Sequence, residues 1–223
     1  METNKTQITL FIIFVFFTSC SDSFPFLEKA KSINIQAHIK NASEYVHLID
    51  SVEVIASSFQ RAEIIGKYPL IDETFSLDLK VPISKSAMRN ISDFIVQRAW
   101  MWDNTPNHYK NETKISNNDA LYCTASFYGV KNGGQTGVVH YSDSKTNVQG
   151  PIRNGNIYFE YMYVDRSLTI TGYDISSYGE KTTYNLILKK GWNLIMLKFI
   201  SENESEKTSE ILFDREWNFS PYY

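Results

Sequence analysis

The chain has 223 residues, a net charge of −3 at pH 7 and a hydrophobic fraction of 43%, with 14 Tyr and 14 Phe. This length is enough for one large or two small domains with a hydrophobic core. The small negative charge excludes the strongly basic surface of a typical nucleic-acid-binding protein, so we expect no such partner. With 10 Gly and 6 Pro the chain is neither fibrous nor of low complexity, and its aromatic content favours strands.

Residues 1–19 have the features of a signal peptide. Lys5 lies in a short polar start, and residues 8–17 are apolar except for Thr9. A membrane-spanning helix needs about 20 apolar residues, whereas a shorter run is typical of a cleaved export signal. We therefore expect the mature protein to work outside the cytoplasm.

The segment Phe17-Thr18-Ser19-Cys20 resembles the bacterial lipobox, in which a hydrophobic residue and two small ones precede an acylated cysteine. This resemblance predicts lipidation of Cys20, with residues 20–30 as a tether. Each buried methylene contributes about 0.8 kcal/mol, so two or more acyl chains hold a protein firmly on a bilayer. Ser21-Asp22-Ser23 resembles the tether of Bacteroidota surface lipoproteins. We expect a lipid-anchored protein of the bacterial outer membrane, on its periplasmic or its surface-exposed side.

A rival interpretation is a secreted eukaryotic glycoprotein with a Cys20–Cys123 disulfide. Sequons begin, among other positions, at Asn41, Asn90, Asn111 and Asn203. A chain rich in Asn, Ser and Thr also produces sequons by chance. Cys123 lies in the apolar, strand-like run 121–125, where a cysteine is most often a small buried hydrophobic residue. We therefore expect Cys123 to be buried and Cys20 to be available for acylation.

Alternating apolar residues predict a β-sandwich-like unit over residues 31–83. The runs 33–39, 52–56 and 75–81 each place apolar side chains on one face and polar ones on the other, as half-buried strands require. Pro82 ends the last of these runs. Residues 84–118 are predicted to be a connector, with one short helix where Met88, Ile91 and Ile95 recur at helical spacing.

Residues 119–223 are predicted to form a larger antiparallel β domain of hairpins. Asn132-Gly133 and Asn154-Gly155 are tight-turn dipeptides, because both residue types accept positive φ. The predicted strands 182–188 and 192–200 carry apolar residues on both faces, which predicts that other parts of the protein cover each of them on both faces. A charged loop over 201–210 and an edge strand at 211–213 would follow. The predicted strands are 121–130, 135–141, 156–164, 167–172, 182–188 and 192–200. The fold class is all-β, of the antiparallel β-sandwich type, with one short helix in the connector.

Two segments, 163–172 and 184–193, together resemble a recurring block of uncharacterised Bacteroidota lipoproteins. They read Tyr163-Val-Asp-Arg-Ser-Leu-Thr-Ile-Thr-Gly172 and Tyr184-Asn-Leu-Ile-Leu-Lys-Lys-Gly-Trp-Asn193. Residues 45–52 and 75–79 match the N-terminal part of the same family. The resemblance implies a surface or periplasmic lipoprotein of unknown activity, so no functional residue is carried over from it.

An aromatic loop provides the candidate binding residues. Trp100, Trp102, His108 and Tyr109 lie beside Asp103 in a run between the predicted helix and the polar connector. Flat aromatic faces next to hydrogen-bonding groups are what sugar recognition needs. The alternative is structural: Trp100 would fill a gap between the two units and Trp102 would cap the core.

Motifs for catalysis are absent from the sequence. There is no Gly-x-Ser-x-Gly, phosphate-binding loop, His-Glu-x-x-His or Cys-x-x-Cys. The four histidines, His38, His47, His108 and His140, are scattered, so we expect no metal and no cofactor. The sequence therefore favours a non-catalytic module that binds glycan or protein or has a structural role, and that is not an enzyme. The alternative is a hydrolase whose carboxylates converge only in three dimensions.

Overall fold

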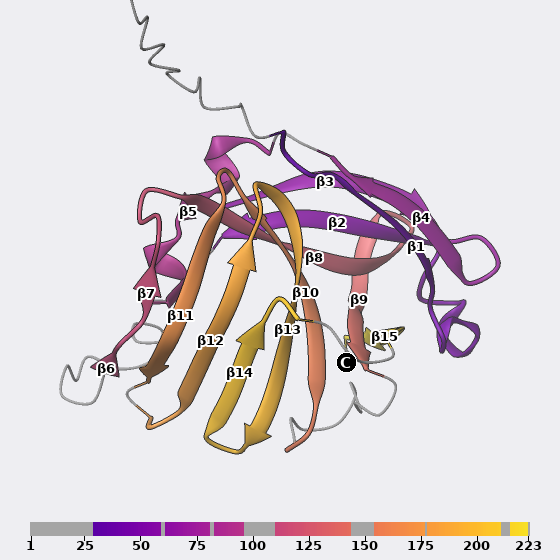
Figure 1. The fold of residues 1–223 in the computed structure, drawn as a ribbon. Helices are drawn as coiled ribbons and strands as arrows, with labels where there is room; N and C mark the ends of the chain where they lie inside the picture. The colour runs from indigo at the N-terminus through magenta and orange to yellow at the C-terminus, as the bar shows by residue number, and fades with distance from the viewer. Residues whose placement is uncertain are drawn as a thin grey trace, which may run out of the picture.

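The computed structural model describes residues 29–58, 61–80, 83–95, 110–143, 154–176, 178–210 and 215–222. Strands dominate these ranges (Figure 1), so the predicted all-β class is confirmed. The strands are β1 (Ile33–His38), β2 (Ser51–Ser58), β3 (Arg61–Pro69), β4 (Thr74–Leu79), β5 (Arg89–Asn90), β6 (Lys110–Asn111), β7 (Lys114–Ile115), β8 (Leu121–Lys131), β9 (Gly134–Asp143), β10 (Ile157–Val164), β11 (Leu168–Ile175), β12 (Lys181–Leu188), β13 (Gly191–Ser201), β14 (Glu204–Thr208) and β15 (Arg215–Pro221). Two 3-10 helices are η1 (Ala42–Tyr45) and η2 (Lys85–Ala87), and residues 92–95 are α-helical.

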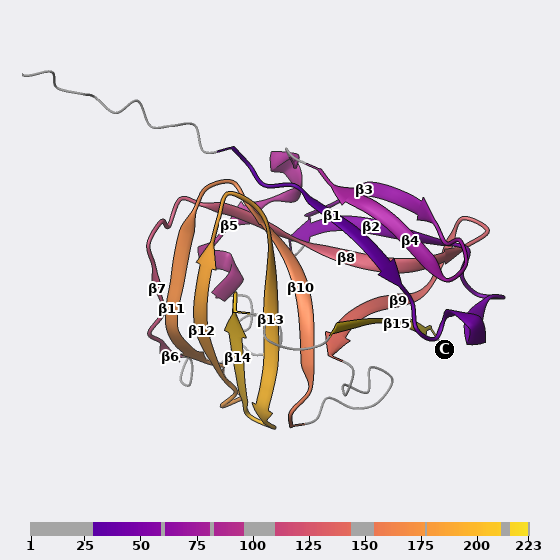
Figure 2. The same cartoon turned by 45° about the vertical axis from the view of Figure 1, so that its right-hand side comes forward.

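Most strands belong to one large, strongly bent sheet. Its main order is β3-β2-β8-β9-β10-β13-β14-β12-β11-β6, and β1 pairs only with β4 in a second, two-stranded sheet. The bend occurs at β8, because residues 122–125 pair with β10 whereas residues 128–131 pair with β9. Figure 2 shows the resulting curved wall of β10 to β14, with β2, β3 and β8 running across its upper end. Among the described strands, only β12 and β14 pair in parallel.

The predicted strand faces 33–39, 52–56 and 75–81 are confirmed where they are described. Side chains such as Ile35, Val54 and Leu77 are buried, and the residues between them along β1 and β4 are exposed. The Asn132-Gly133 turn is also as predicted, with φ of 51° and 85° at its two residues. These features are local properties of the chain, which is why the sequence pattern finds them.

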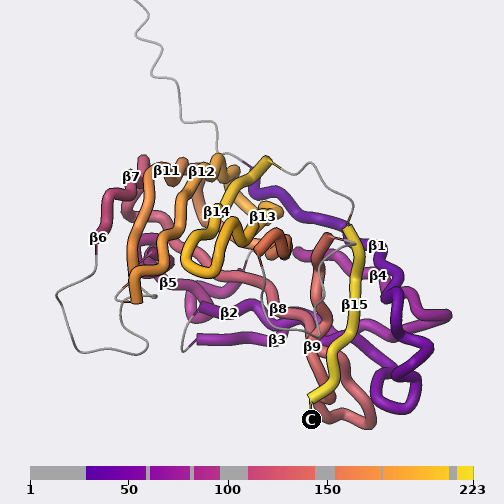
Figure 3. The backbone as a smooth tube through the Cα atoms, turned by 90° about the horizontal axis from the view of Figure 1, so that it is seen from below, coloured from indigo at the N-terminus to yellow at the C-terminus, as the bar shows by residue number. Residues whose placement is uncertain are grey.

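Two cores lie on opposite faces of the strands β8, β10 and β13. The first core is closed by the β1–β4 layer, and the second lies inside the bend, against the helical residues 92–95. Figure 3 views this bend from below, with β11, β12, β13 and β14 along one side and β2, β3 and β8 along the other. Residues an odd number of positions apart therefore face different cores: Cys123 and Tyr122 in β8, Tyr163 and Met162 in β10, and Trp192 and Ile195 in β13.

Burial along β13 confirms one prediction of two-sided burial for most of its length, and burial along β12 corrects another. Residues 192–200 were expected to be covered on both faces, and Trp192 and Ile195 do face different cores, whereas Ile200 at the end of the run is 44% exposed. The same prediction for residues 182–188 is wrong. Leu186 and Leu188 are buried, but Ile187 between them is 62% exposed because it lies on the convex face of the wall.

The sequence-based prediction of a charged loop over residues 201–210 is wrong as well. Residues 204–208 form β14, which pairs antiparallel with β13 and parallel with β12. Its alternating side chains place Ser205 and Lys207 inward, where both are buried. The Ser205 hydroxyl lies 3.1 Å from that of Thr182, and Lys207 Nζ lies 3.1 Å from Glu160 Oε1. These internal partners make a polar sequence acceptable inside a sheet.

Strands of the predicted 31–83 and 119–223 units are hydrogen-bonded into the same sheet. Seven residues of β2, Ser51 to Ser57, pair with β8 residues 124–130. The predicted edge strand at 211–213 lies outside the described residues, and the final strand is β15, which pairs with β9. Within the connector, Ile91 and Ile95 contribute to the second core and residues 92–95 are helical, as predicted, but Met88 is extended and belongs to the first core, so it is not part of the helix.

Candidate functional site

The residues selected from the sequence lie outside the described part of the chain. This holds for the lipidation residue Cys20 and for Trp100, Trp102, Asp103, His108 and Tyr109. The residues immediately after Tyr109 are described, and they form β6. This strand pairs with β11, with Lys110 opposite Ile175 and Asn111 opposite Asp174. The C-terminal end of the aromatic loop is therefore attached to the lower end of the curved wall.

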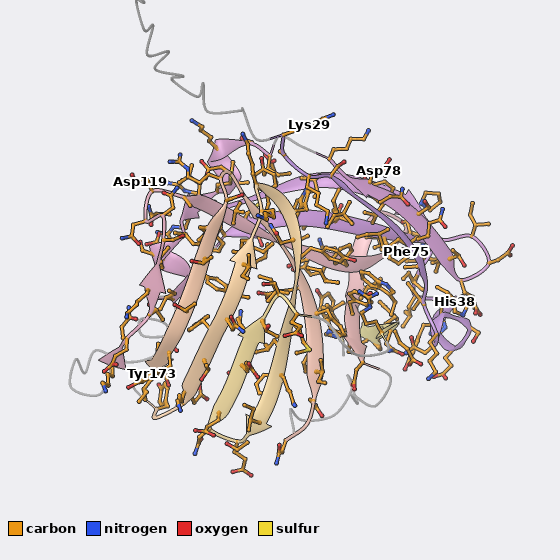
Figure 4. The ribbon with its side chains drawn as sticks, in the orientation of Figure 1. Lys29, His38, Phe75, Asp78, Asp119 and Tyr173 are labelled. Carbon is orange, nitrogen blue, oxygen red and sulfur yellow. The ribbon has the colours of Figure 1, made fainter. Side chains whose placement is uncertain are left out.

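A group of polar and aromatic side chains gathers at this end, and we call it the Tyr173 rim (Figure 4). Tyr173 is its centre, half-buried on β11. Lys110 Nζ donates to the Tyr173 hydroxyl at 2.9 Å, and Lys181 Nζ lies 5.4 Å from the ring centroid. The rim consists of Lys110, Glu112, Tyr173, Tyr178, Lys181 and Glu204.

Two neighbouring turns complete the rim. In the β11–β12 turn, the Ser176 hydroxyl accepts hydrogen bonds from the backbone N–H groups of Tyr178 and Glu180. This turn leaves the Tyr178 side chain 58% exposed. The β13–β14 turn lies alongside, because the N–H of Lys181 donates to the Asn203 carbonyl at 2.7 Å. Three segments distant in sequence thus meet around one exposed tyrosine and one half-buried tyrosine.

Gly172 allows the segment after β6 to approach β11 this closely. Its φ is +99°, and a side chain there would collide with the carbonyl of Glu112. The N–H of Glu112 in turn donates to the Tyr173 carbonyl at 2.9 Å. Glycine is the residue that accepts both the positive φ and the close contact.

The charged groups of the rim are paired with one another. Lys110 Nζ lies 2.6 Å from Glu112 Oε1, and Lys181 Nζ lies 3.7 Å from Glu204 Oε1. The hydrogen bond to Lys110 holds the pKa of Glu112 below its usual value, and the bonds to Glu112 and Tyr173 raise the pKa of Lys110. Both groups are therefore charged at neutral pH, and the rim presents a balanced rather than a one-signed surface.

Inside the curved wall, a row of buried polar side chains lies behind this rim. The Tyr184 hydroxyl donates to Asp174 Oδ2 at 3.1 Å, and Lys207 Nζ lies 4.4 Å from the centroid of the Phe94 ring. Lys207, on β14, contacts both Glu160 on β10 and Phe94, so it links these two strands to the helical residues 92–95. These groups have internal partners, so the row forms a structural network of the concave face.

An open groove of about 360 Å³ lies on the wall itself. Asn185, Ile187, Thr208, Ser209 and Glu210 line it. The Ser209 hydroxyl accepts a hydrogen bond from the Ile187 N–H at 2.7 Å, which fixes one side of the groove. None of the residues selected from the sequence lies among those that line this groove.

The other predicted chemistry residues are dispersed. Cys123 is a fully buried free thiol in the first core, as expected, and burial raises its pKa to about 12. Burial likewise lowers the pKa of His140, whereas His38 lies on the surface, 3.6 Å from a Glu73 carboxylate oxygen. In the described ranges, no three His, Cys, Asp or Glu side chains gather in a way that suits a metal ion.

The sequon residues also bear on the eukaryotic alternative. The Asn41 side chain bonds the backbone of Phe219 twice at 2.8 Å, once as donor and once as acceptor. Asn90 Nδ2 donates to the Asn118 carbonyl at 2.7 Å. Both amide nitrogens are therefore engaged, which disfavours them as glycan acceptors. Cys123 has no disulfide partner among the described residues.

Sequence reasoning missed Tyr173 and both lysines beside it. The predicted strand, residues 167–172, ended at Gly172, whereas β11 continues to Ile175. The apolar alternation does not point beyond Gly172, because the buried face that Leu168 and Ile170 begin is continued by the polar Asp174, while Tyr173 and Ile175 lie on the other face. No sequence pattern joins Lys110, Tyr173 and Lys181, because they meet only through strand pairing.

No described helix has the length and apolar character that a bilayer crossing demands.

Comparison with known proteins adds no family to these observations. No protein-family model, curated protein or solved structure matches the chain. The resemblance of residues 163–193 to Bacteroidota lipoproteins therefore stays a prediction from the sequence.

Proposed function

We propose that this protein is a lipid-anchored, extracytoplasmic and non-catalytic module that binds neutral glycans. The attachment of β6 to β11 carries the proposal, because it joins the end of the aromatic loop to the Tyr173 rim. Cys20 is the lipidated residue, and the outer membrane is the proposed location. A protein ligand at the same rim is the second form of this proposal.

The chemistry of the rim favours a sugar. Tyr173 and Tyr178 provide aromatic surface, and Glu112, Glu204 and the two lysines provide donors and acceptors around it. A sugar ring needs an apolar face to stack on and polar groups for its hydroxyls. The paired charges of the rim favour a neutral sugar over a strongly acidic one.

Tyr173→Ala is expected to weaken binding to a neutral polysaccharide at least about fivefold, since truncating a central contact aromatic costs about 1 kcal/mol or more. Trp100→Ala/Trp102→Ala tests the aromatic loop in the same way. Retention in gels that contain xylan, mannan or β-glucan measures the affinity. The control is Tyr222→Ala, which removes another exposed tyrosine, 54% accessible, at the C-terminus. Equal retention of all folded variants and wild type would refute the glycan assignment.

The anchor has its own test. Cys20→Ser is expected to abolish fatty-acid incorporation and to release the protein from the Triton-soluble lipoprotein fraction, because the acylated side chain is lost. Metabolic labelling with an alkyne fatty acid, followed by membrane fractionation, measures both effects. Cys123→Ser is the matched control, since it changes the other cysteine and leaves the predicted lipobox intact. Equal labelling of wild type and Cys20→Ser would overturn the anchor.

A further inference from the structure

Five lysines converge at the end of the molecule where the described chain begins. Lys29 marks this end in Figure 4, beside the tips of the β10–β11 and β12–β13 hairpins. Four of the five are exposed, and the fifth, Lys190, is half-buried. We call this group the lysine patch; it consists of Lys29, Lys31, Lys80, Lys189 and Lys190.

Backbone hydrogen bonds hold three segments of the patch together. The N–H of Lys31 donates to the Lys190 carbonyl at 3.0 Å, and the N–H of Trp192 donates to the Lys31 carbonyl at 2.9 Å. The indole Nε1–H of Trp192 donates to the Lys80 carbonyl at 3.1 Å. The lysines are thus brought together by the fold, although up to about 160 residues separate them in sequence.

Gly191 shows how closely these segments approach. Its φ is +100°, and a side chain at this position would overlap the backbone of Lys31. The contact between residue 31 and the β12–β13 turn therefore depends on a glycine between Lys190 and Trp192. The run Lys189-Lys190-Gly191-Trp192 is therefore the part of the β12–β13 turn that contacts residue 31.

The patch has little negative charge to balance it. In the described part of the chain, no carboxylate lies within ion-pair distance of any of the five ammonium groups. At the neighbouring hairpin tip, Asp165 is paired with Arg166 at 3.2 Å. Asp78, two residues before Lys80, accepts from the neutral Asn34 amide at 2.6 Å and keeps its negative charge, so it offsets only one of the five lysines. A local excess of positive charge therefore stands out on a chain whose net charge is −3.

From these observations we infer that the lysine patch binds the anionic headgroups of the bilayer that holds the lipid anchor. This inference rests on the proposed lipidation of Cys20. Eight residues lie between Cys20 and Lys29, and even a fully extended chain over these nine steps reaches only about 30 Å. The patch is the part of the described fold nearest to this attachment along the chain. Lysines close to an anionic surface each add about fivefold to the affinity for it.

The resulting orientation is specific. The patch faces the membrane, and the lower end of the curved wall with the Tyr173 rim points away from it; Figure 4 shows Lys29 at the upper end of the molecule and Tyr173 near the lower end. A glycan or protein would then reach the rim without meeting the bilayer. The lipid provides attachment, and the lysines determine which end of the domain is turned toward the headgroups.

The test uses the full processed protein, purified from membranes and reconstituted into vesicles. One set contains only phosphatidylcholine. The other contains phosphatidylcholine with about a third phosphatidylglycerol, which makes the vesicle surface anionic. Lysine side chains are labelled with a water-soluble amine reagent and quantified by mass spectrometry. Labelling of Lys31 and Lys80 is expected to be about fivefold slower on the anionic vesicles. Lys67, exposed on β3, is expected to react equally on both.

Charge reversal provides the matched comparison. Lys189→Glu/Lys190→Glu is expected to abolish the protection of Lys31 and Lys80, whereas Lys67→Glu/Lys198→Glu leaves it unchanged. Equal labelling of the patch on both vesicle types, in protein that floats with the vesicles, would overturn the inference and leave the anchor intact. Protein that does not float with either vesicle would instead refute the lipid anchor itself. Protection that inorganic phosphate removes at constant ionic strength would point to a free-anion site and also overturn it.

Discussion

Trp192→Ala is expected to lower the free energy of unfolding by about 3–5 kcal/mol, the usual cost of truncating a buried tryptophan. Trp192 is fully buried in the first core, and its ring packs edge-on against Tyr163 at 5.5 Å. Its indole N–H also binds the Lys80 carbonyl, which links β13 to the end of β4. The substitution therefore removes apolar packing and a connection between the two sheets together.

Trp192→Phe separates these two contributions. It keeps most of the apolar volume and removes the indole donor, so we expect a smaller loss of about 1–3 kcal/mol. Urea denaturation followed by circular dichroism measures both variants, with Tyr222→Ala as a surface control near zero. A Trp192→Ala loss below about 1 kcal/mol would contradict this account of the first core, because full burial excludes so small an effect.

Alkaline pH is expected to destabilise the protein from about pH 9 upward, partly through Cys123. Burial raises the pKa of the Cys123 thiol to about 12, whereas an unfolded cysteine loses its proton near pH 8.5. Between these two values the unfolded chain holds fewer protons than the folded one, so stability is complete below the lower value and falls as pH rises. Each unit of pH in this window costs about 1.4 kcal/mol for one such group.

Two tyrosines extend the same effect to higher pH. Burial raises the pKa values of Tyr122 and Tyr161, so their hydroxyls resist ionisation in the folded state. Their contribution begins near pH 10, where unfolded tyrosines ionise. Because a variant without the thiol keeps these tyrosines, the difference between wild type and that variant isolates the contribution of Cys123.

Cys123→Ala provides the measurement. Urea midpoints of wild type and Cys123→Ala are compared at pH 7, 8, 9 and 10. Above pH 9 we expect the free energy of unfolding of the wild type to fall more steeply, by about 1.4 kcal/mol per pH unit, because the alanine variant has no thiol to ionise. Parallel pH profiles for the two proteins would show that the thiol is not shielded as its burial indicates.

Several features of the fold were readable from local sequence. Alternation in residues 33–39 and 75–81 identified the buried faces of β1 and β4, because side chains of a strand point to opposite sides in turn. Ile91 and Ile95 reached the second core as their helical spacing indicated. The expectation of a charged loop at 201–210 failed because its polar side chains find partners on other strands, which a local pattern does not reveal.

The candidate site was likewise predictable from the sequence only in part. The aromatic character of residues 100–109 was visible in the sequence, whereas the proximity of Lys110, Tyr173 and Lys181 was not. Strand pairing between β6, β11 and β12 produces that proximity. Which strands pair with one another is determined by packing across the whole sheet rather than by residues adjacent in the sequence.

By itself, the sequence determined the all-β class, the faces of the amphipathic strands, the Asn132-Gly133 turn and the prediction of a lipidated Cys20. These depend on backbone conformation and side-chain chemistry within a few residues. Only the tertiary structure decided that β8, β10 and β13 separate two cores, that Lys207 is buried, and that distant lysines share one end of the molecule. Such features arise from contacts between distant segments, and no local pattern specifies which segments will meet.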